Sequence, residues 1–211
     1  MRRQLLPAIL SMVIFTVLLG LLYPLVLTGI AQAAFSHKAN GSLVEKNGTT
    51  VGSSLIAQAF VDKKGDPVPD YFQPRPSAAG YDPTYSSGSN LGPLNPALIA
   101  KCLKVKSHGK TICDPNTAPQ RAKAYRAFND LAPGVKVPVD AVTASGSGLD
   151  PDISVANALL QAHRVADTRG LSVAKVRSLI KQHTDGRPFG VLGEKTVNVL
   201  DLNLALDKLS A

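Results

Sequence analysis

The sequence predicts an α+β fold, in which a single N-terminal transmembrane helix is followed by one compact extracytoplasmic domain of mixed α/β structure. Three observations lead to this prediction. No Asp, Glu, Lys or Arg occurs between Gln4 and Ser36, a hairpin pattern follows that apolar run, and the C-terminal part mixes helical periodicity with short strand patterns. At 211 residues the chain has room for one ordinary domain and an appendage, which excludes a large multidomain enzyme.

Residues 1–35 are predicted to form a short cytoplasmic N-terminus and a membrane span. Roughly 20 helical residues cross a hydrocarbon core of about 30 Å, and the apolar run is longer than that. Pro24 lies inside the run and predicts a kink. The alternative is a cleavable signal peptide, because Ala31-Gln32-Ala33 fits the small-x-small cleavage pattern. A signal peptide's apolar region has only about 7–15 residues, which favours the uncleaved anchor.

Arg2 and Arg3 precede the span, and the positive-inside rule keeps such flanks on the cytoplasmic side. Residues 36–211 are therefore predicted to form the extracytoplasmic domain. A single-pass protein of the cell inner membrane, with its C-terminal domain in the periplasm, is the expected arrangement.

Short elements are predicted along the first half of this outer domain. Residues 41–58 read as a hairpin whose turn residues are Asn47-Gly48. The proline-rich stretch 62–96 contains several aromatic residues, which favours an irregular loop fastened onto a surface over a disordered linker. Residues 137–143 are a candidate strand.

Two helices and a mixed terminal element are predicted in the second half. Asp150 to Ser154 carry a helix-start signature, and apolar residues then recur at helical spacing until Gly170. Ser172 caps a second helix with an apolar and a basic face. Residues 197–206 begin as a strand and are able to close as a helix.

The segment 101–136 is predicted to be a cationic insert. It holds eight basic and two acidic residues, a balance of +6 out of the net +8 of the whole chain. A solvated helix face and a contact with an anionic lipid or partner are both open, and nucleic acid is not an expected partner. The insert also holds Cys102 and Cys113, which are able to close a disulfide loop in an oxidising compartment; two free thiols are the alternative.

Motifs that carry catalysis are not found. The chain has no phosphate-binding P-loop, and Gly146-Ser147-Gly148 lacks both the third glycine of a dinucleotide site and the glycines of a nucleophile elbow. The four histidines are scattered, and the only two glutamates are Glu45 and Glu194. We therefore expect no catalytic residue, no metal site and no directly bound cofactor.

Six segments together resemble the C subunit of the Kdp-type potassium-transporting ATPases, in the order in which that family has them. The match covers nearly the whole chain, and only the insert 101–136 departs from the family's pattern. The segments are Asn40–Leu43, Gly52–Gln58, Tyr71–Ser77, Gly88–Pro96, Val139–Asp150 and Leu192–Leu206.

The resemblance implies a small accessory subunit of an ATP-driven, high-affinity potassium uptake pump, needed for its assembly. Its expected partners are a channel-like potassium-binding subunit, a P-type ATPase subunit and a small fourth membrane peptide. The family is described as a catalytic chaperone that raises the ATP affinity of the ATPase subunit. ATP and potassium then act at the level of the complex. Because ATP is cytoplasmic and the domain is predicted outside, an allosteric effect fits this topology better than direct contact.

Partner contacts are predicted in the proline-rich loop, because it has apolar and aromatic residues where a mere linker would have polar ones. The candidates are Tyr71, Phe72, Gln73, Arg75, Ser89 and Asn90. The open alternative is that this loop packs on its own domain and that Arg75 makes an internal ion pair. Two rival functions are a free-standing membrane-anchored periplasmic hydrolase using Ser145 or Ser147, and a solitary binding module.

Overall fold

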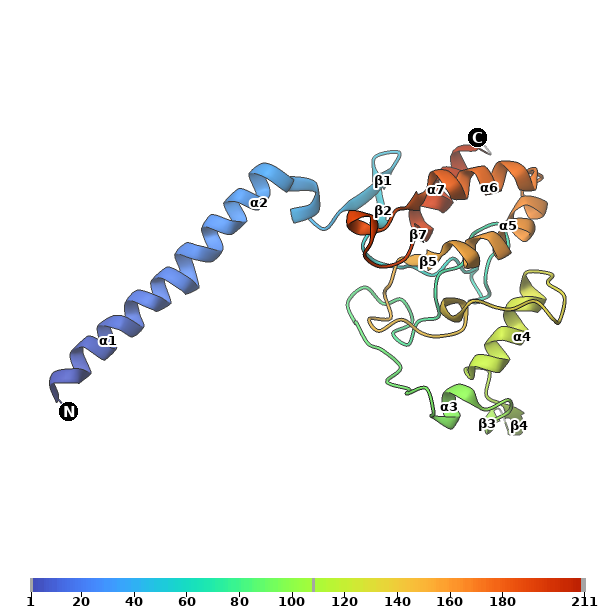
Figure 1. Cartoon of the computed structure of the whole chain (residues 1–211), viewed down its shortest axis with the longest axis horizontal. Coiled ribbons are helices and arrows are strands. Elements are labelled where there is room, and N and C mark those ends of the chain that lie inside the picture. The colour runs from blue at the N-terminus through green and yellow to red at the C-terminus, as the bar shows by residue number, and fades with distance from the viewer. Residues whose placement is uncertain (1, 108, 210–211) are drawn as a thin grey trace. The chain divides into compact units, whose positions relative to one another are not determined.

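The computed structural model describes residues 2–107 and 109–209 and forms two compact units, one ending at Ser53 and the other beginning at Ser54. The sequence predicts a division between residues 35 and 36 instead. The hairpin that follows the long helix thus belongs to the first unit. Figure 1 labels elements of both units along the chain.

The first unit begins with a run of helix that is kinked at Phe35, where φ is −139° and ψ is 39°. It comprises α1 (Arg2–Val17), a π-helical turn (Leu18–Leu22) and α2 (Tyr23–Ala39). Residues Arg3–Ala39 have a mean hydropathy of 2.6 in their most apolar window and bury none of it, so the helix is long and apolar enough to cross a membrane. The wider π turn ends just before Pro24, where a regular helix would press the proline ring against the carbonyl four residues earlier. The sequence predicts a kink at Pro24, and the structure has this π-helical turn there.

The predicted hairpin is confirmed, although it is shorter than expected. β1 (Leu43–Lys46) pairs antiparallel with β2 (Thr49–Ser53). Asn47 and Gly48 connect them with φ of 54° and 76°, the left-handed values that a tight hairpin turn needs.

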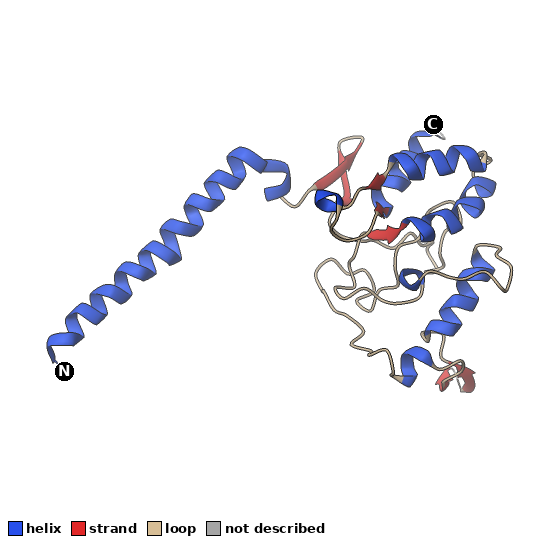
Figure 2. Ribbon diagram, in the orientation of Figure 1, coloured by secondary structure: helices blue, strands red, loops and turns tan. Residues whose placement is uncertain are grey.

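The core of the second unit lies between three helices and a small antiparallel sheet (Figure 2). The sheet order is β5 (Asp152–Ser154), β7 (Thr196–Asn198) and β6 (Thr184–Asp185). The helices are α5 (Val155–Thr168), α6 (Val173–Gln182) and α7 (Val199–Leu209). Their apolar faces bury Ile153, Val165, Val176, Val197, Leu202 and Leu206 almost completely.

The predicted helices and the strand-to-helix change near residue 198 are confirmed. Ser154 accepts a hydrogen bond from the Asn157 N–H and Ser172 accepts one from the Lys175 N–H, so each serine caps the helix that follows it. Gly170 has a φ of 64° and ends α5.

The predicted strand over 137–143 is wrong. The structure has a 3₁₀ turn there, Val139–Ala141. Pro138 has no N–H to give to a sheet. The turn also brings the Asp140 carboxylate to the start of α5, where it accepts hydrogen bonds from the Ser154 N–H and the Asn157 side chain.

Most of the remaining elements lie in and beside the insert. α3 (Pro96–Ile99) ends the proline-rich loop, and a hairpin of β3 (Lys104–Ser107) and β4 (Lys110–Cys113) precedes α4 (Ala118–Phe128). Cys102 and Cys113 form the predicted disulfide, with an S–S distance of 1.98 Å. A second 3₁₀ turn, Pro188–Gly190, stands in the connection between β6 and β7.

Candidate functional site

The proline-rich loop is fastened to the core through the backbone of Phe72. The Phe72 N–H donates to Asn203 Oδ1 at 2.9 Å, and the Asn203 amide donates back to the Phe72 carbonyl at 3.0 Å. The Phe72 ring has no exposed surface and belongs to the hydrophobic core. In this conformation Phe72 holds the loop in place and does not offer a surface to a partner.

Gln73 continues this attachment on α5. Its N–H donates to Gln161 Oε1 at 2.8 Å, while the Gln161 amide donates to the Gln73 carbonyl at 3.1 Å. The Gln73 amide also donates to the carbonyls of Phe60 and Val68. The Gln73 side chain is thus hydrogen-bonded to the backbone of its own domain.

Arg164, also on α5, is a buried cation that joins three segments. Its guanidinium donates to Asn129 Oδ1, to Gln161 Oε1 and to the carbonyls of Pro69 and Tyr71. It also lies 4.4 Å above the ring of Phe128. Burial lowers the pKa of Arg164 to about 10, because the interior disfavours its charge. Within residues 2–107 and 109–209 its charge is met by dipoles and an aromatic face instead of an ion pair.

A second polar cluster ties the insert to α5. The Tyr125 hydroxyl on α4 donates to Asn157 Oδ1 at 2.8 Å, and the Asn157 amide donates to the Asp140 carboxylate at 3.0 Å. Burial, with the negative charge of Asp140, raises the pKa of Tyr125 above its usual range. Part of the insert's positive charge also serves attachment, because Arg121 Nη1 donates to the Val142 carbonyl at 3.3 Å.

Arg75 makes an ion pair inside its own domain. Its guanidinium lies 2.8 Å from Asp150 Oδ2, and both side chains are partly exposed. The Tyr81 hydroxyl donates to the Arg75 carbonyl at 2.7 Å. Burial raises the pKa of Tyr81 to about 12. This geometry agrees with the alternative prediction, in which this part of the loop packs on its own domain and Arg75 makes an internal ion pair.

Close backbone contacts join the loop to residues 145–149. The Ser77 hydroxyl donates to the Gly148 carbonyl at 2.6 Å, and the Ser87 N–H donates to the Ser147 carbonyl at 2.9 Å. Gly148 has a φ of 71°, and a Cβ there would lie 2.5 Å from the Ser87 oxygen. Ser145 is buried, and the Ser147 hydroxyl accepts the Leu149 N–H. Among the described residues no histidine hydrogen-bonds to either serine, so the geometry gives the hydrolase hypothesis no base.

The outer part of the loop, residues 85–94, remains exposed. Ser89 and Asn90 lie on the surface, Tyr85 is 59% exposed and Leu94 is 85% exposed. Of the six predicted contact residues, Ser89 and Asn90 are thus the two that face solvent most fully, and Tyr71, Gln73 and Arg75 are partly buried.

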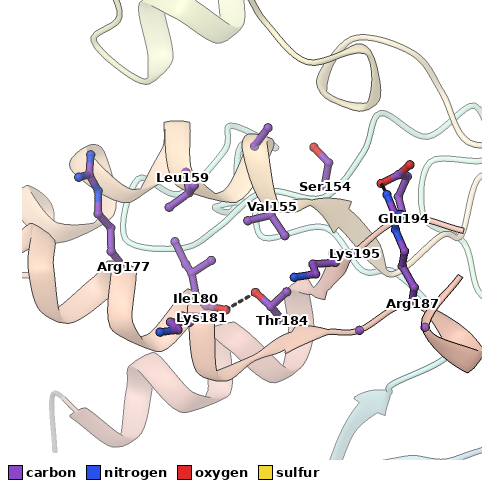
Figure 3. Close-up of a pocket in the computed structure, with 13 residues that line it drawn as sticks. Ser154, Val155, Leu159, Arg177, Ile180, Lys181, Thr184, Arg187, Glu194 and Lys195 are labelled. Atoms are coloured by element: carbon purple, nitrogen blue, oxygen red, sulfur yellow. Dashed lines mark hydrogen bonds and ion pairs between the residues drawn. The ribbon is translucent and has the colours of Figure 1, made fainter.

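A cavity of about 1020 Å³ lies elsewhere in the second unit, along α5 and α6 (Figure 3). Its lining includes four cations, one carboxylate and several apolar side chains: Arg177, Lys181, Arg187, Lys195, Glu194, Val155, Leu159 and Ile180. The figure shows the Arg187–Glu194 pair, 2.7 Å apart, and Lys195 directed toward Val155 and Thr184.

Sequence reasoning missed both the buried cation and the cavity. Asn157, Gln161, Arg164 and Thr168 recur at helical spacing, and this polar stripe on a largely buried helix was the available signal. No sequence pattern brings α6 and residues 187–195 together, since their proximity depends on the pairing of β6 with β7. No cluster of three metal-ligating side chains occurs in the described part of the chain.

Comparisons with known proteins agree on one family. A family model described as "K+-transporting ATPase, c chain" matches residues 5–208. A protein of Mycobacterium tuberculosis (strain H37Rv) named "Potassium-transporting ATPase KdpC subunit" is 51% identical over 211 residues, covering 99% of this chain and all of the relative. Proteins with the same name from Caulobacter sp. (strain K31) and Caulobacter vibrioides (strain NA1000) are 53% and 52% identical over 204 residues, covering 95% of this chain and 91% of each relative.

Proposed function

Because this chain belongs to the KdpC family, the c chain of the K+-transporting ATPases, we propose that it holds the subunits of a potassium uptake pump together as a single-span anchor. Membership of the family makes it an accessory subunit in potassium transport and not the catalytic one. The match over nearly the whole chain, span included, is the observation that carries this proposal.

The proposed partners are the pump's channel-like potassium-binding subunit, its P-type ATPase subunit and a small membrane peptide. The helix Arg3–Ala39 anchors the chain in the inner membrane, with Arg2 and Arg3 on the cytoplasmic side and the second unit outside. The length and hydropathy of this helix support the anchor, and the two arginines support its direction.

Residues 85–94 are the proposed contact with these partners. The loop is held by the Ser87–Ser147 hydrogen bond and by the close approach of Gly88 to Gly146, so its exposed part is fixed before it docks. Leu94 projects an apolar side chain that makes little contact with its own domain.

The test is Leu94→Asp in the full chain, produced together with the other pump subunits. We expect the isolated chain to keep its melting temperature, because Leu94 is exposed, and recovery of the complex to fall at least tenfold, about 1.4 kcal/mol. Val139→Asp is the matched control, since Val139 is 73% exposed and lies outside the loop. Normal recovery of the complex with Leu94→Asp would remove this loop from the proposed interface.

We further propose that the subunit raises the ATP affinity of the ATPase subunit allosterically, by binding better to the conformation that holds ATP. Adding the subunit to the isolated ATPase subunit should then lower its KM for ATP, while in the intact pump a photoreactive ATP analogue should label the ATPase subunit alone. Labelling of this chain in the intact pump would mean that it contacts nucleotide directly.

A further inference from the structure

The cavity along α5 and α6 gathers positive charge that its own lining does not neutralise. Glu194 pairs with Arg187. Arg177, Lys181 and Lys195 make no ion pair within residues 2–107 and 109–209. Asp185 does not line the cavity; it follows Thr184 on β6, and neighbouring strand residues point to opposite faces.

The same cavity has an apolar floor. Val155 and Leu159 from α5 and Ile180 from α6 line it, and Leu159 is 40% exposed although it is an aliphatic side chain. The lining as a whole offers more apolar than polar surface. A small hydrophilic anion would use the cations and leave this floor in contact with water. The site therefore fits a ligand that is both anionic and apolar.

The loop at one end of the cavity ends in an apolar tip, made of Phe189, Val191 and Leu192. These side chains are 93%, 76% and 56% exposed. Phe189 has a φ of 53°, a left-handed conformation that disfavours a bulky residue by roughly 1–2 kcal/mol. Backbone strain that holds a phenylalanine out in water is typical of a surface meant to be covered.

We propose that this cavity and the apolar tip bind an anionic phospholipid of the bilayer that carries the chain's own span. The anionic headgroup lies at the cavity, where Lys181 and Lys195 supply positive charge, and the tip enters the headgroup and acyl boundary. Basic residues beside exposed Phe and Leu are the chemistry of interfacial membrane binding, and each Lys or Arg near an anionic surface contributes about a factor of five in affinity.

The second unit is also tied to a bilayer by its own chain. It begins at Ser54, after the unit that holds the helix Arg3–Ala39, so it stays tethered to the membrane in which that helix is proposed to lie. Tethering keeps the lipid at a high effective concentration, so a weak headgroup site is occupied.

The test uses the full chain with Phe189→Trp in lipid nanodiscs. The protein has no tryptophan, so in discs whose scaffold protein also lacks tryptophan the new indole is the only one and reports on the tip alone. In discs of phosphatidylcholine with phosphatidylglycerol we expect a blue-shifted emission that brominated acyl chains quench. In discs of phosphatidylcholine alone we expect the emission of an indole in water.

Charge variants separate the headgroup site from simple apolar insertion. Adding Lys181→Glu and Lys195→Glu should return the emission in anionic discs to that in phosphatidylcholine alone. The same reversal at two exposed lysines outside the cavity, Lys175→Glu and Lys208→Glu, should leave the quenching intact. Quenching that is equal in both lipids, or that survives loss of Lys181 and Lys195, would overturn the proposal.

Two further experiments test other ligands for the cavity and the tip. Inorganic phosphate or ATP, added at millimolar concentration to phosphatidylcholine discs, should not shift the emission; a shift equal to that in anionic discs would make the site one for soluble anions. If lipid leaves the indole unchanged but assembly with the other pump subunits shields it from a soluble quencher, the tip is a protein interface and the proposal fails.

Discussion

Arg164 is a buried cation whose removal tests the attachment of the proline-rich loop. Arg164→Met keeps the length and apolar bulk of the side chain but leaves Asn129 Oδ1 and the Tyr71 carbonyl without their donor. An unpaired buried polar group costs roughly 1–3 kcal/mol, so we expect a loss of about 2–4 kcal/mol of unfolding free energy.

Urea unfolding of the full chain in detergent, followed by tyrosine fluorescence, measures this loss. Arg177→Met is the control, since Arg177 is exposed, and it should change stability by about 0.5 kcal/mol or less. Equal effects of the two substitutions would mean that the Arg164 hydrogen bonds add nothing beyond packing.

Asp152 provides a prediction about pH. Burial, together with the negative charges of Asp150 and Asp185, raises the pKa of the Asp152 carboxyl above its usual value near 3.8. The folded state then binds the proton more tightly than the unfolded state, so the stability present at low pH is lost as pH rises through the raised pKa.

Asp152→Asn removes this penalty, and we expect the variant to melt above the parent protein at pH 7. The difference should shrink as the pH falls through the raised pKa of the parent carboxyl. Asp167→Asn, at an exposed carboxylate, serves as the control. A melting temperature below that of the parent at pH 7 would show that the Asp152 charge is stabilising.

At the scale of elements, the close packing of the chain at Ala79, Ser87 and Gly148 depends on the glycine. Gly148→Ala places a Cβ 2.5 Å from the Ser87 oxygen and 2.8 Å from the Ala79 Cβ, at a φ of 71°. Strain and overlap together should destabilise the domain by about 2–3 kcal/mol.

Gly146→Ala is the matched control for this close packing, because its Cβ would meet nothing within 4 Å and its φ is not positive. Thermal melts of the two variants should differ by several degrees, with Gly146→Ala close to the parent protein. Similar melts would show that the loops move apart freely.

Sequence reasoning recovered elements that local chemistry determines. The Asn47-Gly48 turn, the helix start signalled by Asp150 to Ser154, the Ser172 cap and the disulfide all follow from residues near one another in the chain. It failed over 137–143, because β-rich composition does not reveal that Pro138 and the Asp140 cap on α5 prevent strand pairing. Phe72 in the core and the cavity along α6 depend on packing between distant segments, which no local pattern encodes.

For the whole molecule, the helix Arg3–Ala39 spans 37 residues, nearly twice what a bilayer core requires. We expect the mature protein to keep it, and intact mass spectrometry of the purified chain should include residues 2–35. A mass that corresponds to a chain starting after Ala33 would show that a signal peptidase removes the span.

The Cys102–Cys113 disulfide also allows the redox state of the insert to report whether the domain has left the cytosol. Cytosolic glutathione keeps such thiols reduced, so in the proposed topology we expect the bond to close only after the domain has been exported. In cells quenched with acid and alkylated before lysis, the oxidised fraction should equal the translocated fraction. When the export machinery is stalled, the two cysteines should stay reduced. The redox state of this disulfide would then report membrane topology without a fusion tag.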